Sequence, residues 1–185
     1  MAETSTLGYA LLGLLARAPL SGWDLAQRLD MPAGYFWSAG HSQIYPELKK
    51  LERAKLVKHT KVEQRDRPDK KVYALTAAGR RALRRWVTTP LAPAPKRDEL
   101  MLRVYSLWLA DPADAVAFVR DQEAVHRRRI AEYETHQADV EQHWAAELDD
   151  PRSPRFATYA TLRRGLGYER ELADWCAWLA SRITS

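Results

Sequence analysis

The chain has 185 residues, 29% of them charged, which suits one ordinary domain or two small ones with a buried core. Its longest apolar run, residues 7–16, is far shorter than the roughly 20 residues that cross a bilayer, and the preceding residues lack the positive charge of a secretory signal. A single cysteine excludes an internal disulfide framework and predicts a reducing, cytoplasmic location with no membrane partner.

Two short helices are predicted near the N-terminus. Apolar residues at helical spacing over 7–15 indicate the first, with an N-cap among residues 4–6 and a stop at Pro19. Ser21 starts the second, because Asp24 follows it three positions later as in a capping box.

A third helix is predicted after the next break in the chain. Ser42 is its expected N-cap, and Ile44, Leu48 and Leu51 recur at positions that form one apolar face. Polar residues occupy the opposite face and its flanks, and Glu47 is expected to stay in solvent.

A basic hairpin follows this helix. Strands are predicted over about 57–63 and 71–75, joined by segment 64–70, and Thr76 is expected to cap a fourth helix. A small helix beside a basic hairpin is the arrangement of a winged helix-turn-helix, which reads duplex DNA.

Charge is divided unevenly along the chain. Residues 1–95 hold 16 Lys and Arg against 8 Asp and Glu, a net charge of +8, whereas residues 96–185 hold 13 against 16, a net charge of −3. This asymmetry predicts that the first half works beside a polyanion. The alternative is a basic surface that serves only solubility.

Three prolines within residues 90–95 favour an extended connector over helix. We therefore predict a mainly α protein with a winged helix-turn-helix domain over 1–88, a linker over 89–95 and an all-α dimerisation and effector domain over 96–185.

Beyond this linker the pattern indicates only helices, the longest of them starting near residue 116. Its apolar residues recur at alternating three- and four-residue steps, with some polar interruptions, and such a seam is typical of an interface. DNA readers of this kind commonly pair, because two-fold symmetric half-sites need two reading heads. The predicted dimer interface comprises Val119, Ile130, Tyr133, Val140 and Trp144. An intramolecular three-helix bundle is the alternative.

Several segments of the chain, taken in order, resemble the PadR family of bacterial transcriptional regulators. The most specific is Ser-Gln-Ile-Tyr-Pro-Glu-Leu-Lys-Lys-Leu-Glu over residues 42–52. The others are Leu7–Leu15, Ser21–Leu25, Phe36–Ser38, Leu56–Val57 and Tyr73–Gly79. The second half is similar in length and helicity to the longer subfamily, which has a C-terminal helical domain. Family members usually have Gly where this chain has Lys55.

The resemblance implies a homodimeric repressor that binds a pseudo-palindromic operator and leaves it when a small molecule binds. The inducer of the founding members is a phenolic acid, but other members answer to drugs or to unknown signals, so the inducer does not carry over. A small-molecule effector is expected here, and a phenolic or other aromatic compound is one candidate. A cytoplasmic, nucleoid-associated location follows, and no cofactor is expected.

The third helix and the hairpin supply the predicted DNA contacts. Gln43 can form paired hydrogen bonds with an adenine edge, and lysines of the same helix can reach guanine acceptors or phosphates. Tyr45 can donate its hydroxyl to a phosphate or be a half-buried core residue. The full set is Ser42, Gln43, Tyr45, Pro46, Lys49 and Lys50 on the helix and Lys61, Arg65, Arg67, Lys70 and Lys71 on the wing. A solvated charged face is the alternative for the wing.

Aromatic residues are the candidates for an effector site, because flat ligands fit aromatic-lined cavities. Trp23, Phe36, Trp37 and Trp108 are predicted to contribute, and ordinary core packing is the alternative.

An enzyme is not expected, because the sequence has no recognisable catalytic motif and Cys176 reads as a small apolar residue of a helix. Two other functions stay open. A winged helix can bind an acidic protein instead of DNA. A metal-responsive regulator is the other alternative, because Glu132, His136, Asp139 and His143 would share one helix face.

Overall fold

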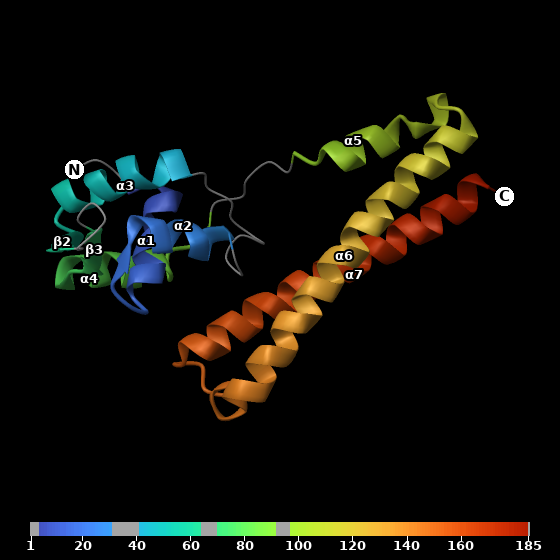
Figure 1. The fold of residues 1–185 in the computed structure, drawn as a ribbon. Helices are drawn as coiled ribbons and strands as arrows, with labels where there is room; N and C mark the ends of the chain where they lie inside the picture. The colour runs from blue at the N-terminus through green and yellow to red at the C-terminus, as the bar shows by residue number, and fades with distance from the viewer. Residues whose placement is uncertain (1–3, 31–40, 64–69, 92–96, 185) are drawn as a thin grey trace. The chain divides into compact units, whose positions relative to one another are not determined.

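The computed structural model describes residues 4–30, 41–63, 70–91 and 97–184. The chain forms two compact units, Met1–Ala92 and Pro93–Ser185, which we name the N-terminal and C-terminal units (Figure 1). No helix within the described ranges is both long enough and apolar enough to cross a membrane.

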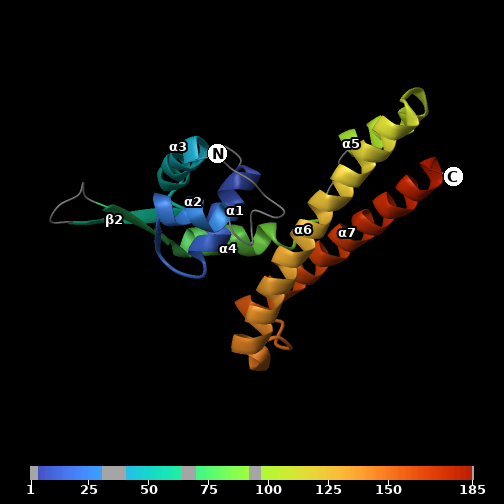
Figure 2. The same ribbon diagram turned by 45° about the vertical axis from the view of Figure 1, so that its right-hand side comes forward.

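The N-terminal unit combines short helices with a small antiparallel sheet, which confirms the predicted winged helix-turn-helix. Its elements are α1 (Thr6–Leu15), β1 (Leu20–Ser21), α2 (Gly22–Asp30), α3 (His41–Arg53), β2 (Val57–Val62), β3 (Lys70–Leu75) and α4 (Ala77–Trp86). The strand order is β1-β3-β2, and β2 with β3 forms the wing, which projects from the helices in Figure 2. The two-residue strand β1 was not predicted, because it is too short to show an alternating pattern.

One hydrophobic core holds the N-terminal unit together. Leu11 of α1, Leu25 of α2 and Ile44 of α3 are completely buried in it, and Tyr73 of the central strand joins them. The predicted apolar face of α3 is therefore its inner face. Burial of this kind stabilises by about 1.5–3 kcal/mol per large side chain, so the core decides which face of α3 meets solvent.

Side-chain caps start several of these helices. Ser5 caps α1 by accepting a hydrogen bond from the backbone N–H of Gly8 at 3.0 Å. The predicted capping box of α2 is confirmed, because Asp24 accepts from the Ser21 N–H at 3.0 Å and donates its own N–H to the Ser21 hydroxyl at 3.2 Å. Ser42 is not an N-cap, as α3 already begins at His41.

Lys55 ends α3 in a left-handed conformation, with a φ of 60°. The Leu56 N–H donates to the Leu51 carbonyl and the Lys55 N–H to the Glu52 carbonyl, both at 2.9 Å, which is a Schellman motif. The Thr76 hydroxyl donates to the Lys55 carbonyl at 2.8 Å, so this turn also joins α3 to the start of α4. Gly is the residue that adopts this conformation without a steric cost.

Lys55→Gly is expected to stabilise the protein by about 0.5–1 kcal/mol, because it removes the left-handed penalty at a modest cost in chain entropy. Urea denaturation measures the change. Lys58→Gly is the control, because Lys58 is an exposed strand residue without a positive φ and should lose stability on the same change. Equal destabilisation of both variants would contradict this account.

The C-terminal unit is helical throughout its described part. Its elements are α5 (Glu99–Tyr105), η1 (Leu107–Leu109), α6 (Pro112–Trp144), η2 (Ala145–Glu147) and α7 (Pro154–Ile183). Both views show α6 and α7 packed side by side as an antiparallel hairpin (Figures 1 and 2). Asp111 and Ser153 cap the two long helices, each followed by a proline in the first turn, where a missing N–H costs little.

The seam of α6 packs against α7 of the same chain. Val119 joins Cys176 and Ala180 in a buried cluster. Tyr133 is also buried, and its ring packs so closely on Gly165 of α7 that a Cβ added to this glycine would lie 2.5 Å from the ring. Val119 and Tyr133, which the sequence assigned to a dimer interface, are therefore covered by α7 of the same chain. Periodicity identifies a buried helix face, but it does not say which helix covers it.

Polar interruptions of the seam are buried and partnered. The His126 Nδ1 lies 2.5 Å from a carboxylate oxygen of Glu169 on α7. Glu123 accepts from Arg120 at 2.6 Å and from Arg127 at 2.9 Å. The hydrogen bond from Arg120 lowers the pKa of Glu123, and the one from Arg127 adds to this effect, whereas burial opposes it. These pairs satisfy charges that would otherwise oppose the packing of α6 on α7.

Exposed apolar side chains gather on α5 and η1, neither of which has a buried residue. The exposed fractions of Leu102, Tyr105 and Trp108 are 69%, 84% and 80%, and Leu109 is similarly exposed. We name these four residues the α5–η1 patch. Exposed large apolar side chains grouped in this way commonly mark a site of association.

Candidate nucleic-acid interface

The outer face of α3 carries the residues predicted to read DNA. Ile44 and Leu48 fix the helix from the inside, and the opposite side is left open to solvent. The exposed residues are Ser42, Gln43, Tyr45, Pro46, Lys49 and Lys50. The structure therefore brings all six predicted helix residues to one surface.

Glu47 contradicts the expectation that it stays in solvent, since only 6% of it is exposed. Its carboxylate accepts a hydrogen bond from the Ser5 hydroxyl at 2.6 Å, which ties α3 to the start of α1. Its other oxygen lies 3.0 Å from the Lys50 ammonium. Glu47 follows Ile44 by three positions and borders Leu48, and this spacing was the signal that it flanks the buried face.

The lysines of α3 consequently differ. Lys50 is held by Glu47, whereas Lys49 has no ion pair among the residues that the structure describes. Lys49 is the freer cation for a base edge or a phosphate.

Tyr45 combines the two roles considered for it. Its ring lies against the start of α2, where a Cβ on Gly22 would come within 2.5 Å of it, yet 48% of the residue is exposed. The ring packs while part of the side chain faces solvent, as suits an amphipathic residue. Gly22 is needed here for this close approach.

The wing lies next to α3 and is tied to it. Glu52 near the end of α3 contacts the Nδ1 of His59 in β2. The strand register places Lys61 directly opposite Lys71, and both are exposed. Like charges in facing positions of a sheet are unfavourable, and a bound anion would offset this repulsion. Arg65 and Arg67 lie outside the described residues.

Lys70 also starts the second strand of the wing, but it is partnered. Its ammonium lies 3.1 Å from the carboxylate of Asp24 in α2. The hydrogen bond from the Ser21 hydroxyl lowers the pKa of Asp24, burial opposes this, and Lys70 adds to the lowering. Lys70 thus helps to anchor the wing on α2.

Asp24→Asn is expected to lower the free energy of unfolding by up to about 1 kcal/mol at pH 7, because the pair is partly exposed. The folded-state pKa of Asp24 lies below its ordinary value of 3.8, so this stabilisation is present above that pH and is lost as the pH falls through the lowered pKa. Urea titrations at pH 7, 5 and below 4 measure the difference between variant and wild type. A difference that persists unchanged in acid would contradict the role of the charge.

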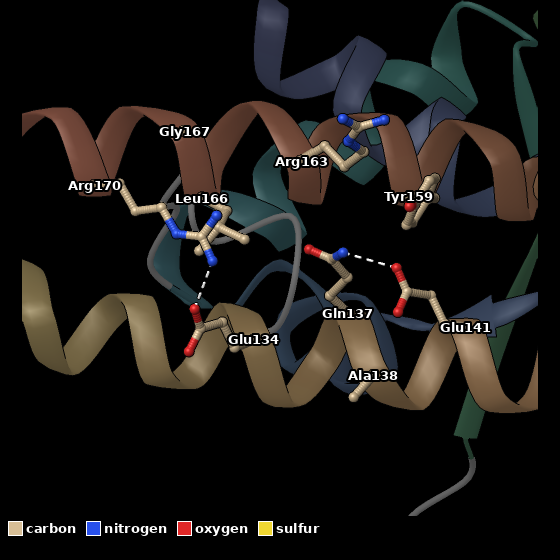
Figure 3. Close-up of a pocket in the computed structure, with 9 residues that line it drawn as sticks. All are labelled: Glu134, Gln137, Ala138, Glu141, Tyr159, Arg163, Leu166, Gly167 and Arg170. Carbon is tan, nitrogen blue, oxygen red and sulfur yellow. Dashed lines mark hydrogen bonds and ion pairs between the residues drawn. The ribbon is translucent and has the colours of Figure 1, made fainter.

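Two of the predicted effector residues lie in the described part of the chain. Trp23 in the N-terminal unit and Trp108 in the C-terminal unit are both mostly exposed, and Phe36 and Trp37 lie outside the described residues. A groove of about 540 Å³ runs between α6 and α7 (Figure 3). It is lined by Glu134, Gln137, Ala138, Glu141, Tyr159, Arg163, Leu166, Gly167 and Arg170.

The polar groups of this groove largely satisfy one another. Arg170 crosses from α7 to Glu134 at 2.6 Å, and the Gln137 amide donates to Glu141 at 2.7 Å (Figure 3). A hydrogen bond with Glu141 is the main cause that raises the pKa of Tyr159. The groove is therefore polar and internally paired.

In the part of the chain that the structure describes, neither a metal site nor a reactive cysteine is supported. Within the described ranges, no group of three His, Cys, Asp or Glu side chains lies close enough to hold a metal ion, and His143 contacts the Asp139 carboxylate at 3.1 Å. Cys176 is buried, and burial raises the pKa of its thiol, which disfavours the nucleophilic thiolate.

A three-helix core, an outward third helix with polar residues and a basic two-stranded wing define a winged helix-turn-helix protein. The model of the transcriptional regulator PadR-like family matches residues 11–85, and that of the virulence activator alpha C-terminal domain matches residues 96–184.

Comparisons with whole proteins agree. The chain is 36% identical to the negative transcriptional regulator PadR of Bacillus subtilis over 180 residues, which covers 96% of this chain and 97% of the relative. It is 34% identical to a probable transcriptional regulator of Mycobacterium tuberculosis over 184 residues, with the same two coverages. The chain belongs to the PadR-like family of transcriptional regulators.

Solved structures show the same relationship. The crystal structure of B. subtilis PadR in complex with operator DNA has a TM-score of 0.83 and 30% identity, covering 97% of this chain and 99% of that one. The structure of the same regulator with p-coumaric acid has a TM-score of 0.77 and 31% identity, covering 98% of this chain and all of the other.

Proposed function

We propose that this transcriptional regulator is a sequence-specific DNA-binding repressor, active as a homodimer on a pseudo-palindromic operator and released by a small aromatic effector. The observation that carries the proposal is the outer face of α3, whose exposed polar row lies beside the opposed lysines of the wing. The B. subtilis relative has been solved with operator DNA, which supports the same use of the fold here.

Each element has a distinct task in this proposal. The outer face of α3 enters the major groove, where Gln43 reads an adenine and Lys49 reaches a guanine or a phosphate. Ser42 and the N–H groups of the first turn bind the backbone, and Tyr45 donates to a phosphate. Lys61 and Lys71 neutralise phosphates and make binding depend strongly on salt.

The dimer contact is best sought on the α5–η1 patch. The most exposed large apolar side chains in the described part of the C-terminal unit are those of this patch, Leu102, Tyr105, Trp108 and Leu109. A second copy of the chain would cover them. Of the residues assigned from the seam, Ile130, Val140 and Trp144 are at least partly exposed and stay candidates for the edge of this contact.

The effector is proposed to be a small aromatic acid. The support is the B. subtilis relative, solved with p-coumaric acid, together with the exposed tryptophans Trp23 and Trp108 of this chain. Release requires that the effector bind the DNA-free form more tightly than the DNA-bound form.

A titration of the protein–DNA complex with p-coumaric acid tests the proposal. The DNA is a duplex that the protein itself enriches from genomic fragments, labelled for fluorescence anisotropy. The expected result is dissociation of the complex with a saturable dose dependence, and cyclohexanecarboxylic acid, which lacks the aromatic ring, is expected to be much weaker. A complex that resists p-coumaric acid and a panel of other aromatic acids would contradict control by this ligand class.

A further inference from the structure

The outward face of α4 carries four arginines that the proposed reading of an operator does not use. The opposite side of the helix, with Gly79 and Ala82, is buried against the unit. The four residues, which we name the arginine face, are Arg80, Arg81, Arg84 and Arg85, and all are exposed. Among the described residues none of their guanidinium groups forms an ion pair.

The stability of α4 does not explain this concentration of charge. Arg80 with Arg84, and Arg81 with Arg85, are like charges one helical turn apart, and such pairs destabilise a helix. The helix dipole favours cations only in the last turn, which accounts for Arg84 and Arg85 but not for the other two. The first turn has no acidic residue to offset them. A bound polyanion would relieve all of this repulsion.

The arginine face points away from the surface that α3 presents. Both α3 and α4 pack on α1. They lie on opposite sides of it in both views (Figures 1 and 2). A duplex bound to the outer face of α3 would therefore lie on the opposite side of the N-terminal unit from the arginine face.

The composition of this face favours a nucleic acid over a protein. Protein interfaces centre on buried aromatic or aliphatic anchors. Trp86, the exposed aromatic residue at the end of α4, already stacks on Tyr9 with ring centroids 4.6 Å apart and planes 8° apart. Guanidinium groups bind phosphate through paired hydrogen bonds, and they need no anchor beside them.

We propose that the arginine face binds the phosphate backbone of a second DNA duplex, so that the regulator holds two segments of DNA together. The inference rests on the proposed DNA-binding function and extends it, because it adds a contact that is independent of sequence. A homodimer would present two such faces.

A two-duplex capture assay with the full chain tests this. A duplex enriched from genomic DNA by the protein is immobilised and saturated with protein, and a labelled duplex of random sequence is then added at moderate salt. Wild type is expected to retain the labelled duplex. Replacing all four residues of the arginine face by Gln should reduce this capture at least about tenfold and leave the affinity for the immobilised duplex within about twofold. Gln is a good helix former, and circular dichroism checks that α4 persists.

A charge-matched control separates a local contact from net charge. It replaces four exposed arginines of the C-terminal unit by Gln, namely Arg128, Arg152, Arg164 and Arg182. This control is expected to capture as wild type does. The proposal is overturned if wild type binds the immobilised duplex but captures no second one, as it would if the face docked an acidic protein. It is also overturned if both variants lose capture equally, or if the arginine-face variant loses the immobilised duplex in parallel. Failure of wild type to bind the immobilised duplex would instead contradict the proposed DNA-binding function itself.

Discussion

Replacing Leu102 and Trp108 together by Glu is expected to turn the protein into a monomer and to weaken operator binding at least about 100-fold. Two charges in the α5–η1 patch would have to be desolvated on association, which opposes the dimer. Once the chains separate, the second reading head no longer benefits from the high effective concentration that linkage provides, an advantage of about 10²–10⁴. Sedimentation velocity measures the oligomeric state, and anisotropy with an enriched duplex measures the affinity.

A matched control introduces Glu at two other exposed aromatic residues of the C-terminal unit. Tyr168→Glu with Trp178→Glu is expected to leave both the dimer and the affinity unchanged, because these side chains lie on α7 outside the patch. A Leu102 and Trp108 variant that stays dimeric would place the interface elsewhere. A folded monomer with full operator affinity would contradict the need for two reading heads.

Gln43→Ala is expected to weaken binding to the enriched operator by about 10- to 100-fold while hardly changing the affinity for random DNA. A well-placed bidentate contact to a base contributes about 1–3 kcal/mol of discrimination, and Ala removes it without changing net charge. Competition between operator and random duplexes at one fixed salt concentration measures the ratio.

Lys49→Ala supplies the contrast, because Lys49 lies on the same exposed face without an ion pair among the described residues. If it contacts a phosphate, its removal should lower the affinity for both duplexes alike and reduce the salt slope by about one. Equal losses on both duplexes for Gln43→Ala would instead show that Gln43 does not read a base.

Much of the N-terminal unit could be predicted because its local signals agree. The spacing of Ile44 and Leu48 fixed which face of α3 is buried, and Ser21 with Asp24 marked the start of α2. Glu47 was misjudged because residue type outweighed its position beside that face. Its burial depends on the Ser5 hydroxyl, 42 residues away, which no local pattern reveals.

The features that could not be predicted depend on contacts between segments that are distant in the sequence. The α6 seam was recognisable, but whether a second copy or α7 covers Tyr133 depends on where Gly165 leaves space. The ion pair of Lys70 with Asp24 likewise needs the sheet register, so the sequence alone could not separate Lys70 from Lys71. Lys55 was noted only through the family resemblance, and the structure gives its left-handed conformation.

The most direct test is a titration of the purified protein against an enriched genomic duplex and a scrambled duplex of equal length and composition, at one physiological salt concentration. The expected result is a preference of at least about 10³ for the enriched duplex. Two chains should bind each such duplex. Equal affinities for the two duplexes would contradict sequence-specific binding. Negligible binding to either would favour the alternative of a winged helix that docks on an acidic protein.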